Sequence, residues 1–142
     1  MLGSRRLLVV GLIIVGALLI GVLTVALKKS DPYRSACDKF IGYVMKQDST
    51  SSYNMLSASA RANATQDQWK SSVISLTNVY RQAKLQFVSK STITQPNGDS
   101  TQTRTLMKYT VKNPAATSNV TCYVLSGNNK TYAVDGFQSV IE

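Results

Sequence analysis

The chain has 142 residues, of which 44% are hydrophobic, and its 16 Lys and Arg residues against 7 Asp and Glu give a formal net charge of +9. This length accommodates one modest folded domain with an appendage, and it excludes a two-lobed enzyme with a cleft between its domains. The sequence contains no histidine, so the commonest metal ligand and the commonest general base near neutral pH are both missing.

An uncharged apolar segment over residues 7–27 is the first feature of the chain. At 1.5 Å rise per residue, a helix of this length spans about 31 Å, roughly the hydrocarbon core of a bilayer. Basic side chains that can reach both membrane interfaces flank it: Arg5, Arg6, Lys28 and Lys29. The pattern predicts a transmembrane helix over 7–27, a short cytoplasmic tail over 1–6 and a linker over 28–31.

A cleaved signal peptide is the alternative interpretation of this segment, since Thr24-Val25-Ala26 would serve as a cleavage site. The apolar run exceeds the roughly 7–15 residues of a typical signal peptide, which favours an uncleaved anchor. Basic residues on both flanks leave the orientation open. The remainder of the chain is rich in Ser, Thr, Asn and Gln and contains both cysteines. We therefore expect the N-terminus in the cytoplasm and a domain over 32–142 outside the membrane.

Helical periodicity predicts three helices at the start of this exterior domain, over about 32–47, 50–60 and 66–83. Ser30 or Asp31 caps the first of them, and Pro32 fits its first turn. Thr65 and Gln68 have the spacing of a capping box at the start of the third. The apolar faces of the first and third helices consist of Tyr33, Cys37, Phe40, Ile41, Val44, Trp69, Val73, Leu76, Tyr80 and Ala83.

The periodicity then changes to alternation, which predicts four strands, over about 85–93, 103–112, 119–125 and 131–141. Pro96-Asn97-Gly98-Asp99 is typical of a hairpin turn between the first two, and Asp135-Gly136 predicts a bulge in the last. Helices followed by an antiparallel meander predict an α+β fold, with three helices packed on one face of a curved four-stranded sheet.

Several of these positions together resemble the nuclear transport factor 2-like, or cystatin-like, superfamily. They are Ala36-Cys37-x-x-Phe40, the Asp48-Ser49 break, Tyr53-x-x-Leu56, the capped helix with Trp69, and the closing Tyr132-x-Val134-x-Gly136-Phe137 strand. The chain looks most like the small, membrane-anchored bacterial members of that superfamily. The resemblance implies a cone-shaped domain, in which a bent sheet wraps around a long helix and an apolar pocket opens at its mouth.

The resemblance also implies a range of functions, because the superfamily includes enzymes, ligand-binding proteins and bitopic assembly subunits of type IV secretion machines. We expect a membrane-anchored, non-enzymatic ligand- or protein-binding module, with an assembly subunit of a type IV secretion-like or conjugation-like envelope machine as the alternative. A hydrolase or isomerase using the pocket is a further alternative. Asp135 and a tyrosine are its only catalytic candidates, since a pocket carboxylate is the minimum that such chemistry needs.

Site candidates come from the cysteines and the aromatic residues. Cys37 lies on the apolar face of the first helix and Cys122 on the third strand, and in the cone arrangement that helix lies against that sheet. An oxidising exterior would allow one disulfide between them; two buried free thiols are the alternative. Residues that would line a ligand pocket are Tyr43, Trp69, Tyr80, Phe87, Tyr109, Tyr123 and Phe137.

The sequence indicates neither a metal site nor a cofactor, because two cysteines without a histidine make a poor zinc site. Lysines and arginines are spread along the chain rather than gathered into the basic stripe that nucleic-acid binding requires. The expected partners are therefore the lipid bilayer, and either another envelope protein or a small apolar ligand. Core packing is the alternative role for most of the aromatic residues.

Overall fold

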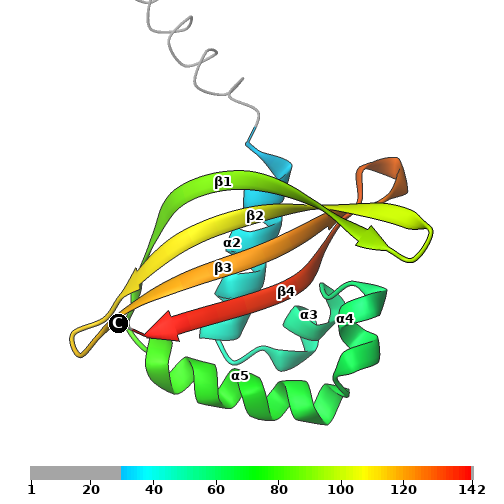
Figure 1. Ribbon diagram of the computed structural model, residues 1–142. Coiled ribbons are helices and arrows are strands. Elements are labelled where there is room, and N and C mark those ends of the chain that lie inside the picture. Colours follow the sequence, from blue (N-terminus) through cyan, green and yellow to red (C-terminus); the bar gives the residue numbers. More distant parts are fainter. Residues whose placement is uncertain (1–29, 142) are drawn as a thin grey trace, which may run out of the picture. The chain divides into compact units, whose positions relative to one another are not determined.

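The computed structural model describes residues 30–141. The predicted cytoplasmic tail, the predicted transmembrane helix and residues 28–29 of the predicted linker lie outside the described residues. Within residues 30–141, no helix is both long enough and apolar enough to cross a bilayer. The residues from Asp31 onward form a unit of their own, and this unit is an α+β domain (Figure 1).

The helices come first in this domain: α2 (Pro32–Met45), α3 (Ser49–Asn54), α4 (Ala58–Asn63) and α5 (Gln66–Tyr80). Polar side chains cap them, because the first backbone N–H groups of a helix have no partner within it. Asp31 caps α2, Asp48 caps α3 by accepting from the backbone N–H of Ser51, and Thr65 forms the predicted capping box with Gln68 at α5.

The segment predicted as one helix over 50–60 is two helices, because the residues between α3 and α4 pair with the sheet. Leu56 forms a parallel bridge with Val134. The backbone N–H of Ser57 donates to the Val134 carbonyl at 2.8 Å, and the N–H of Val134 donates to the Met55 carbonyl at 2.8 Å. These groups cannot also continue a helix. The prediction of three helices is therefore wrong, and the described residues form four α-helices.

Helix α5 ends at Tyr80, before the predicted end at 83. Gln82 has a left-handed backbone with φ of 60°, which turns the chain out of the helix and into the first strand. The side-chain amide of Asn113 donates to the Val79 carbonyl in the last turn of α5. This contact supplies a partner for one of the carbonyl groups that every helix end leaves unpaired.

The four strands form one antiparallel sheet in the order β1-β2-β3-β4, which confirms the predicted meander. Their bounds are β1 (Lys84–Asn97), β2 (Ser100–Lys112), β3 (Thr117–Ser126) and β4 (Tyr132–Ile141). β1 and β2 continue to a tight turn at Gly98, whose φ of +61° suits glycine. Tyr123 pairs with Gly136 and Val124 with Val134, so Asp135 is the additional residue of the predicted bulge.

The core lies between α2 and the sheet, with α5 along its lower edge and α3 and α4 at one end (Figure 1). Its largest fully buried side chains are Phe40, Ile41, Tyr80, Met107 and Tyr109. Cys37 of α2 and Cys122 of β3 are both fully buried and form a disulfide, with their Cα atoms 6.2 Å apart. The bridge ties the central helix to the middle of the sheet, and it confirms the predicted pairing.

Candidate functional site

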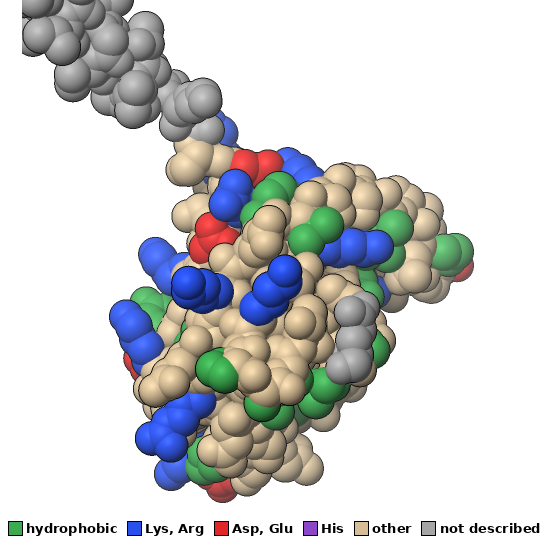
Figure 2. Space-filling view, turned by 90° about the vertical axis from the view of Figure 1, so that its left-hand side faces the viewer, with side chains coloured by type: hydrophobic (Ala, Val, Ile, Leu, Met, Phe, Trp, Pro, Cys, Tyr) green, Lys and Arg blue, Asp and Glu red, His purple; other side chains and the backbone are tan. Residues whose placement is uncertain are grey.

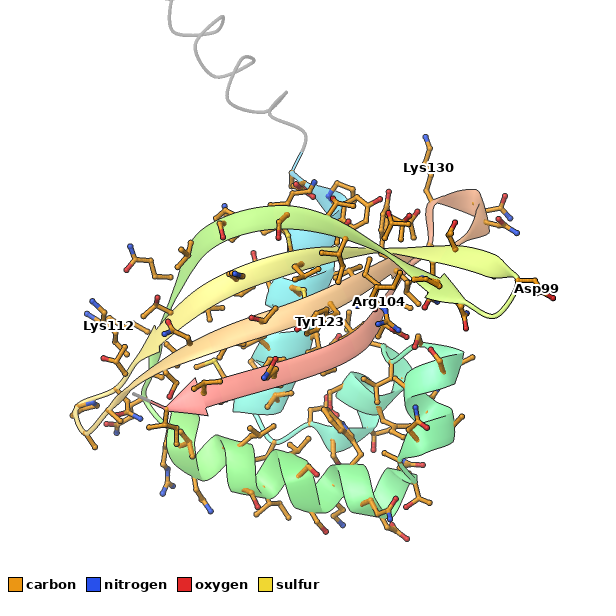
Figure 3. All side chains as sticks on the ribbon, in the orientation of Figure 1. Asp99, Arg104, Lys112, Tyr123 and Lys130 are labelled. Atoms are coloured by element: carbon orange, nitrogen blue, oxygen red, sulfur yellow. A yellow bond between two sulfur atoms is a disulfide. The ribbon has the colours of Figure 1, made fainter. Side chains whose placement is uncertain are left out.

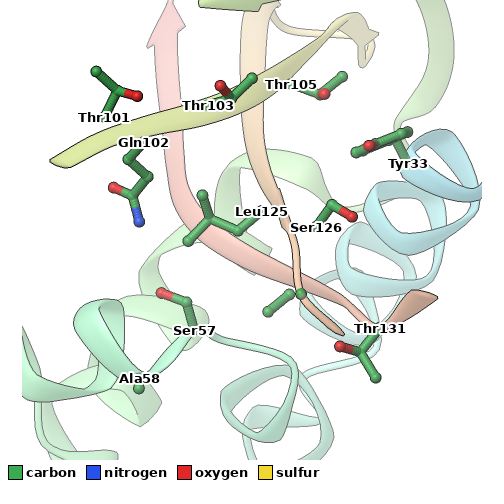
Figure 4. A pocket seen from close by; sticks show the side chains of 12 residues that line it. Tyr33, Ser57, Ala58, Thr101, Gln102, Thr103, Thr105, Leu125, Ser126 and Thr131 are labelled. Carbon is green, nitrogen blue, oxygen red and sulfur yellow. The ribbon is translucent and has the colours of Figure 1, made fainter. Parts of the chain in front are cut away.

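A pocket of about 580 Å³ opens where β2, the end of β3 and the start of β4 meet the loop before α4 (Figure 4). This volume is in the range of pockets that hold small ligands, about 300–1,000 Å³. Hydroxyl-bearing side chains dominate its lining: Tyr33, Ser57, Thr101, Thr103, Thr105, Ser126 and Thr131. The remaining lining residues are Ala58, Gln102, Leu125, Gly127 and Ala133. Among these described lining residues, none carries a charged side chain.

Three threonines at alternate positions of β2 form one wall of the pocket. Side chains at i, i+2 and i+4 of a strand share a face of the sheet, and Figure 4 shows Thr101, Thr103 and Thr105 following one another along β2. Thr103 makes a hydrogen bond with Thr94 of β1 at 3.3 Å. Thr101, Thr103 and Thr105 belong to β2 of the long β1–β2 hairpin. The alternation of side chains along this strand places all three on the same face.

Thr105 differs from the other two threonines because most of the residue is buried, with only 5% of it exposed. Its hydroxyl makes no hydrogen bond within residues 30–141, and Arg104 Nε is the one described side-chain polar atom that is both buried and without a hydrogen-bond partner, so the Thr105 hydroxyl is open to solvent in the pocket. A bound molecule would take the place of water at this donor and acceptor.

Gln102 is the amide in the lining, and Arg104 fixes its orientation. The Nη2 of Arg104 donates to Gln102 Oε1 at 3.2 Å, and its Nη1 donates to Gln95 Oε1 of β1 at 3.0 Å. Because the carbonyl oxygen of Gln102 accepts from Arg104, its NH₂ group is turned away from the guanidinium. Gln102 thus offers hydrogen-bond donors, whereas the threonine hydroxyls can both donate and accept.

Asp135, the bulge residue of β4, lies behind the pocket and joins β2 to α4. Its Oδ2 is 2.7 Å from Arg104 Nε, and its side chain is 3% exposed. The Nε–H does not point straight at the carboxylate, so this contact is an ion pair rather than a linear hydrogen bond. Ser57 and Ser59 each donate to Asp135 Oδ1 at 2.5 Å. Figure 3 shows Arg104 at the end of the sheet that faces these short helices.

The surroundings of Asp135 keep its carboxylate ionised. Burial by itself raises the pKa of Asp135, but the hydrogen bonds from Ser57 and Ser59 and the charge of Arg104 outweigh it, and the net pKa lies below the usual value. Such a carboxylate is a weak base. The Oγ of Ser57 is also engaged as the helix cap, since it accepts from the backbone N–H of Ala60 at 3.1 Å. Asp135 and Ser57 are therefore arranged to hold the structure together rather than to carry out nucleophilic attack.

Tyr33 closes one end of the pocket, and its ring is held in place from two sides. The rings of Tyr33 and Tyr132 meet edge to face with centroids 4.9 Å apart. Lys90 Nζ lies 4.7 Å from the centre of the Tyr33 ring and 2.6 Å from Asp31 Oδ2. Burial raises the pKa of Asp31. The contact with Lys90 and the helix-cap hydrogen bonds lower it by more, so the net pKa lies below the usual value. Partly exposed pairs of this kind add little stability, but they orient the ring.

The seven aromatic residues predicted to line a ligand pocket lie outside this one. Tyr80 and Tyr109 are buried in the core, and their hydroxyls donate to Ser139 and Asp38. Burial, followed by the contact with Asp38, raises the pKa of the Tyr109 phenol far above its usual value. Both tyrosines therefore have the packed and hydrogen-bonded environment of core residues.

The other five predicted pocket residues are partly buried and lie at several different places in the domain. Trp69 and Phe137 are partly buried and both pack against Phe40, with ring centroids 5.7 Å and 5.6 Å from it. Phe87 is also partly buried and meets Tyr109 edge to face, with ring centroids 5.7 Å apart.

Tyr43 and Tyr123 are half-buried, and the Tyr123 hydroxyl donates to Gln138 at 3.4 Å. The structure thus brings Trp69 and Phe137 together around Phe40, in the core rather than at the pocket.

The described part of the chain contains no metal centre built from charged side chains, and the face shown in Figure 2 shows no continuous basic patch. No cluster of three or more Cys, Asp or Glu side chains there could hold a metal ion. On the face shown in Figure 2, Lys and Arg side chains are separated by uncharged polar surface. Nucleic-acid binding needs a continuous basic patch or stripe, and this face does not offer one.

Sequence reasoning missed the pocket because it looked for aromatic residues. The signal that could have identified the site is the Thr101-x-Thr103-x-Thr105 alternation, which places three hydroxyls on one face of a strand.

Comparison with protein-family models, with curated proteins and with solved structures gives no match for this chain.

Proposed function

We propose that this chain is a membrane-anchored binding module whose folded domain lies outside the membrane and binds a ligand or another protein without chemical transformation. In this proposal the 7–27 segment is the transmembrane anchor, the 1–6 tail is cytoplasmic, and the domain is a cone of the nuclear transport factor 2-like kind. The observation that carries the proposal is the lining of the pocket, which offers hydroxyl and amide groups with no charged side chain among its described residues.

The disulfide supports an exterior location for the domain. Cys37 and Cys122 are bridged and fully buried, and disulfides persist in oxidising compartments but are rare in the cytosol. The uncharged 7–27 segment supports a membrane anchor, because its length as a helix matches the hydrocarbon core of a bilayer. Both observations favour a domain held at the outer surface of a membrane.

The pocket supports binding more than catalysis. Acid–base or nucleophilic chemistry needs a group with a suitable pKa and a hydrogen-bonded partner in the pocket. Asp135 contacts the lining residue Ser57, and its lowered pKa together with three partners makes it a poor base. A hydrolase or isomerase is therefore a weaker proposal than a binding module.

Native mass spectrometry of the full chain, extracted from its own membrane in mild detergent, tests this proposal. The test variant is Ala58→Trp, which places an indole at the pocket lining. The matched control is Ala62→Trp, because Ala62 is also exposed on α4 but is not among the lining residues. We expect a bound species on the wild type and the control, and its loss from Ala58→Trp.

The outcomes separate the proposal from its alternatives. The same bound species on the wild type and on Ala58→Trp contradicts a function based on the pocket. A stoichiometric complex with other envelope proteins that withstands Ala58→Trp favours the alternative of an assembly subunit of a secretion-like machine. Turnover of the released species by the wild type, and not by Asp135→Asn, favours a pocket enzyme.

A further inference from the structure

The chemistry of the pocket lining restricts the class of ligand that the proposed binding function can serve. A charged ligand that entered the pocket would lose water and find no oppositely charged side chain among the described lining residues. Arg104 is the nearest cation behind Gln102, but Asp135 neutralises it at 2.7 Å. A buried ligand charge would therefore have no partner.

An apolar ligand meets the opposite difficulty. It would cover the threonine wall of β2 and Gln102, and it would leave their hydroxyl and amide groups without water and without a replacement partner. The Thr105 hydroxyl is open to solvent in the pocket and has no partner within residues 30–141, so an apolar ligand would remove its water and leave it unsatisfied. The lining thus disfavours the small apolar ligand that the sequence suggested.

A neutral ligand with many hydroxyl groups fits both requirements. Sugar hydroxyls donate and accept, as do those of Thr101, Thr103 and Thr105. The C–H faces of a sugar ring suit the apolar surface that Tyr33 and Leu125 contribute to the same lining. A volume of about 580 Å³ accommodates a short oligosaccharide rather than a single ion or water cluster.

An extended peptide is also neutral and polar, but it usually binds by adding a strand to a free sheet edge. Thr105 pairs with β1 and β3, whereas Thr101 and Thr103 pair with β1 alone. The pocket therefore presents side-chain hydroxyls beside a short open edge of backbone groups, and the trialanine comparator below separates a peptide from a sugar. We infer that the pocket is a binding site for a neutral saccharide, an inference that rests on the proposed binding function.

The test compares Thr105→Val with Thr110→Val in the full chain, purified in detergent with its disulfide intact. Valine keeps the branched shape of threonine and replaces its hydroxyl with a methyl group. Thr110 is on the same strand as Thr105 at an odd spacing, so it faces the other side of the sheet, and it is not among the lining residues. Binding is titrated by calorimetry with maltotriose, the N-acetylglucosamine trimer and mannotriose, and with trigalacturonate and trialanine as charged and peptide comparators.

The inference predicts binding of at least one neutral trisaccharide by the wild type and by Thr110→Val. Thr105→Val is expected to bind it at least tenfold more weakly, which corresponds to about 1.4 kcal/mol. The same variant is expected to leave the Tm of the unliganded protein nearly unchanged, because the Thr105 hydroxyl makes no hydrogen bond within residues 30–141 that the variant would lose. Lower affinity with an unchanged Tm separates loss of a ligand contact from damage to the fold.

Binding of trigalacturonate or trialanine alone overturns the assignment of the ligand class and leaves the binding function standing. Equal affinity of Thr105→Val and wild type for the neutral sugars overturns the assignment of Thr105 to the site. If no neutral trisaccharide binds, the saccharide inference fails, and the native mass comparison of Ala58→Trp with Ala62→Trp decides the binding function separately.

Discussion

Removal of the Cys37–Cys122 disulfide is expected to destabilise the domain strongly. The two cysteines are 85 positions apart in sequence, so the bridge restricts a large part of the unfolded chain. The chain-entropy relation gives a loss of about 15 cal/mol/K for a loop of this length, which is about 4.6 kcal/mol at 25 °C. Small domains have a total free energy of unfolding of about 5–15 kcal/mol. The bridge is therefore expected to supply a large share of the stability.

The assay is urea unfolding of the full chain in detergent, followed by fluorescence. The chain contains one tryptophan, Trp69, whose indole N–H donates to Ser52 Oγ at 2.9 Å and which packs against the core. Its emission reports the unfolding of the described domain. With a urea dependence of about 2 kcal/mol per M, reduction should lower the midpoint by about 2 M. Cys37→Ala/Cys122→Ala should shift it in the same direction.

Comparison of the oxidised wild type, the reduced wild type and the double alanine variant separates the two contributions. The reduced wild type reports the crosslink, and the double variant adds the loss of two buried sulfur atoms. A difference below about 1 kcal/mol between the oxidised and reduced proteins would refute the entropic reasoning.

Three further predictions concern Asp135, Tyr109 and the hairpin turn. Asp135→Asn should lower the free energy of unfolding by about 2 kcal/mol at pH 7. Because the folded-state pKa of Asp135 is lowered, its contribution is complete above the unfolded-state pKa of about 3.9 and disappears as the pH falls through the folded-state pKa; a pH series of urea unfolding should show a flatter acid limb for the variant. The raised pKa of the Tyr109 phenol predicts the reverse dependence, in which stability is complete below about pH 10 and falls above it; Tyr109→Phe should reduce this alkaline loss, and an unchanged alkaline limb would speak against the buried phenol. Gly98→Ala should cost about 1 kcal/mol because φ at this position is +61°, whereas Asp99→Ala should be nearly neutral in thermal unfolding; equal effects of the two would rule out the turn conformation as the cause.

Much of the fold follows from local sequence signals in this chain. The capping box at Thr65 and Gln68, the turn at Gly98 and the bulge at Asp135 each involve residues close in sequence, and the structure confirms all three. The order of the strands followed as well, because short connections between alternating segments favour an antiparallel meander. Local chemistry and hydrophobic periodicity were sufficient for these elements.

The division between α3 and α4 could not be predicted in the same way. It depends on the pairing of Leu56 with Val134, two residues far apart in sequence. Short segments adopt the structure that tertiary contacts favour, even where their helical pattern continues. The early end of α5 has a local cause, the left-handed backbone of Gln82, but glutamine gives little sign of this conformation in a sequence.

The location of the pocket also depended on contacts that a sequence does not reveal. Ser57 and the threonines of β2 reach the same cavity only because α4 lies against β4. Aromatic residues attracted attention as ligand contacts, but Tyr80 and Tyr109 are core residues whose hydroxyls are already paired. Fold prediction from periodicity was therefore more successful than site prediction from residue type.

The most direct test of the central proposal is the topology of the chain in intact cells. A cysteine is introduced by Asp99→Cys at the exposed tip of the β1–β2 hairpin (Figure 3) and, in a separate variant, by Ser4→Cys in the predicted cytoplasmic tail. Each variant is treated with a membrane-impermeant maleimide before and after lysis, without reductant. The proposal predicts labelling of Asp99→Cys in intact cells and of Ser4→Cys only after lysis. Labelling of Asp99→Cys only after lysis would contradict a membrane-anchored binding module with its domain outside the cell membrane.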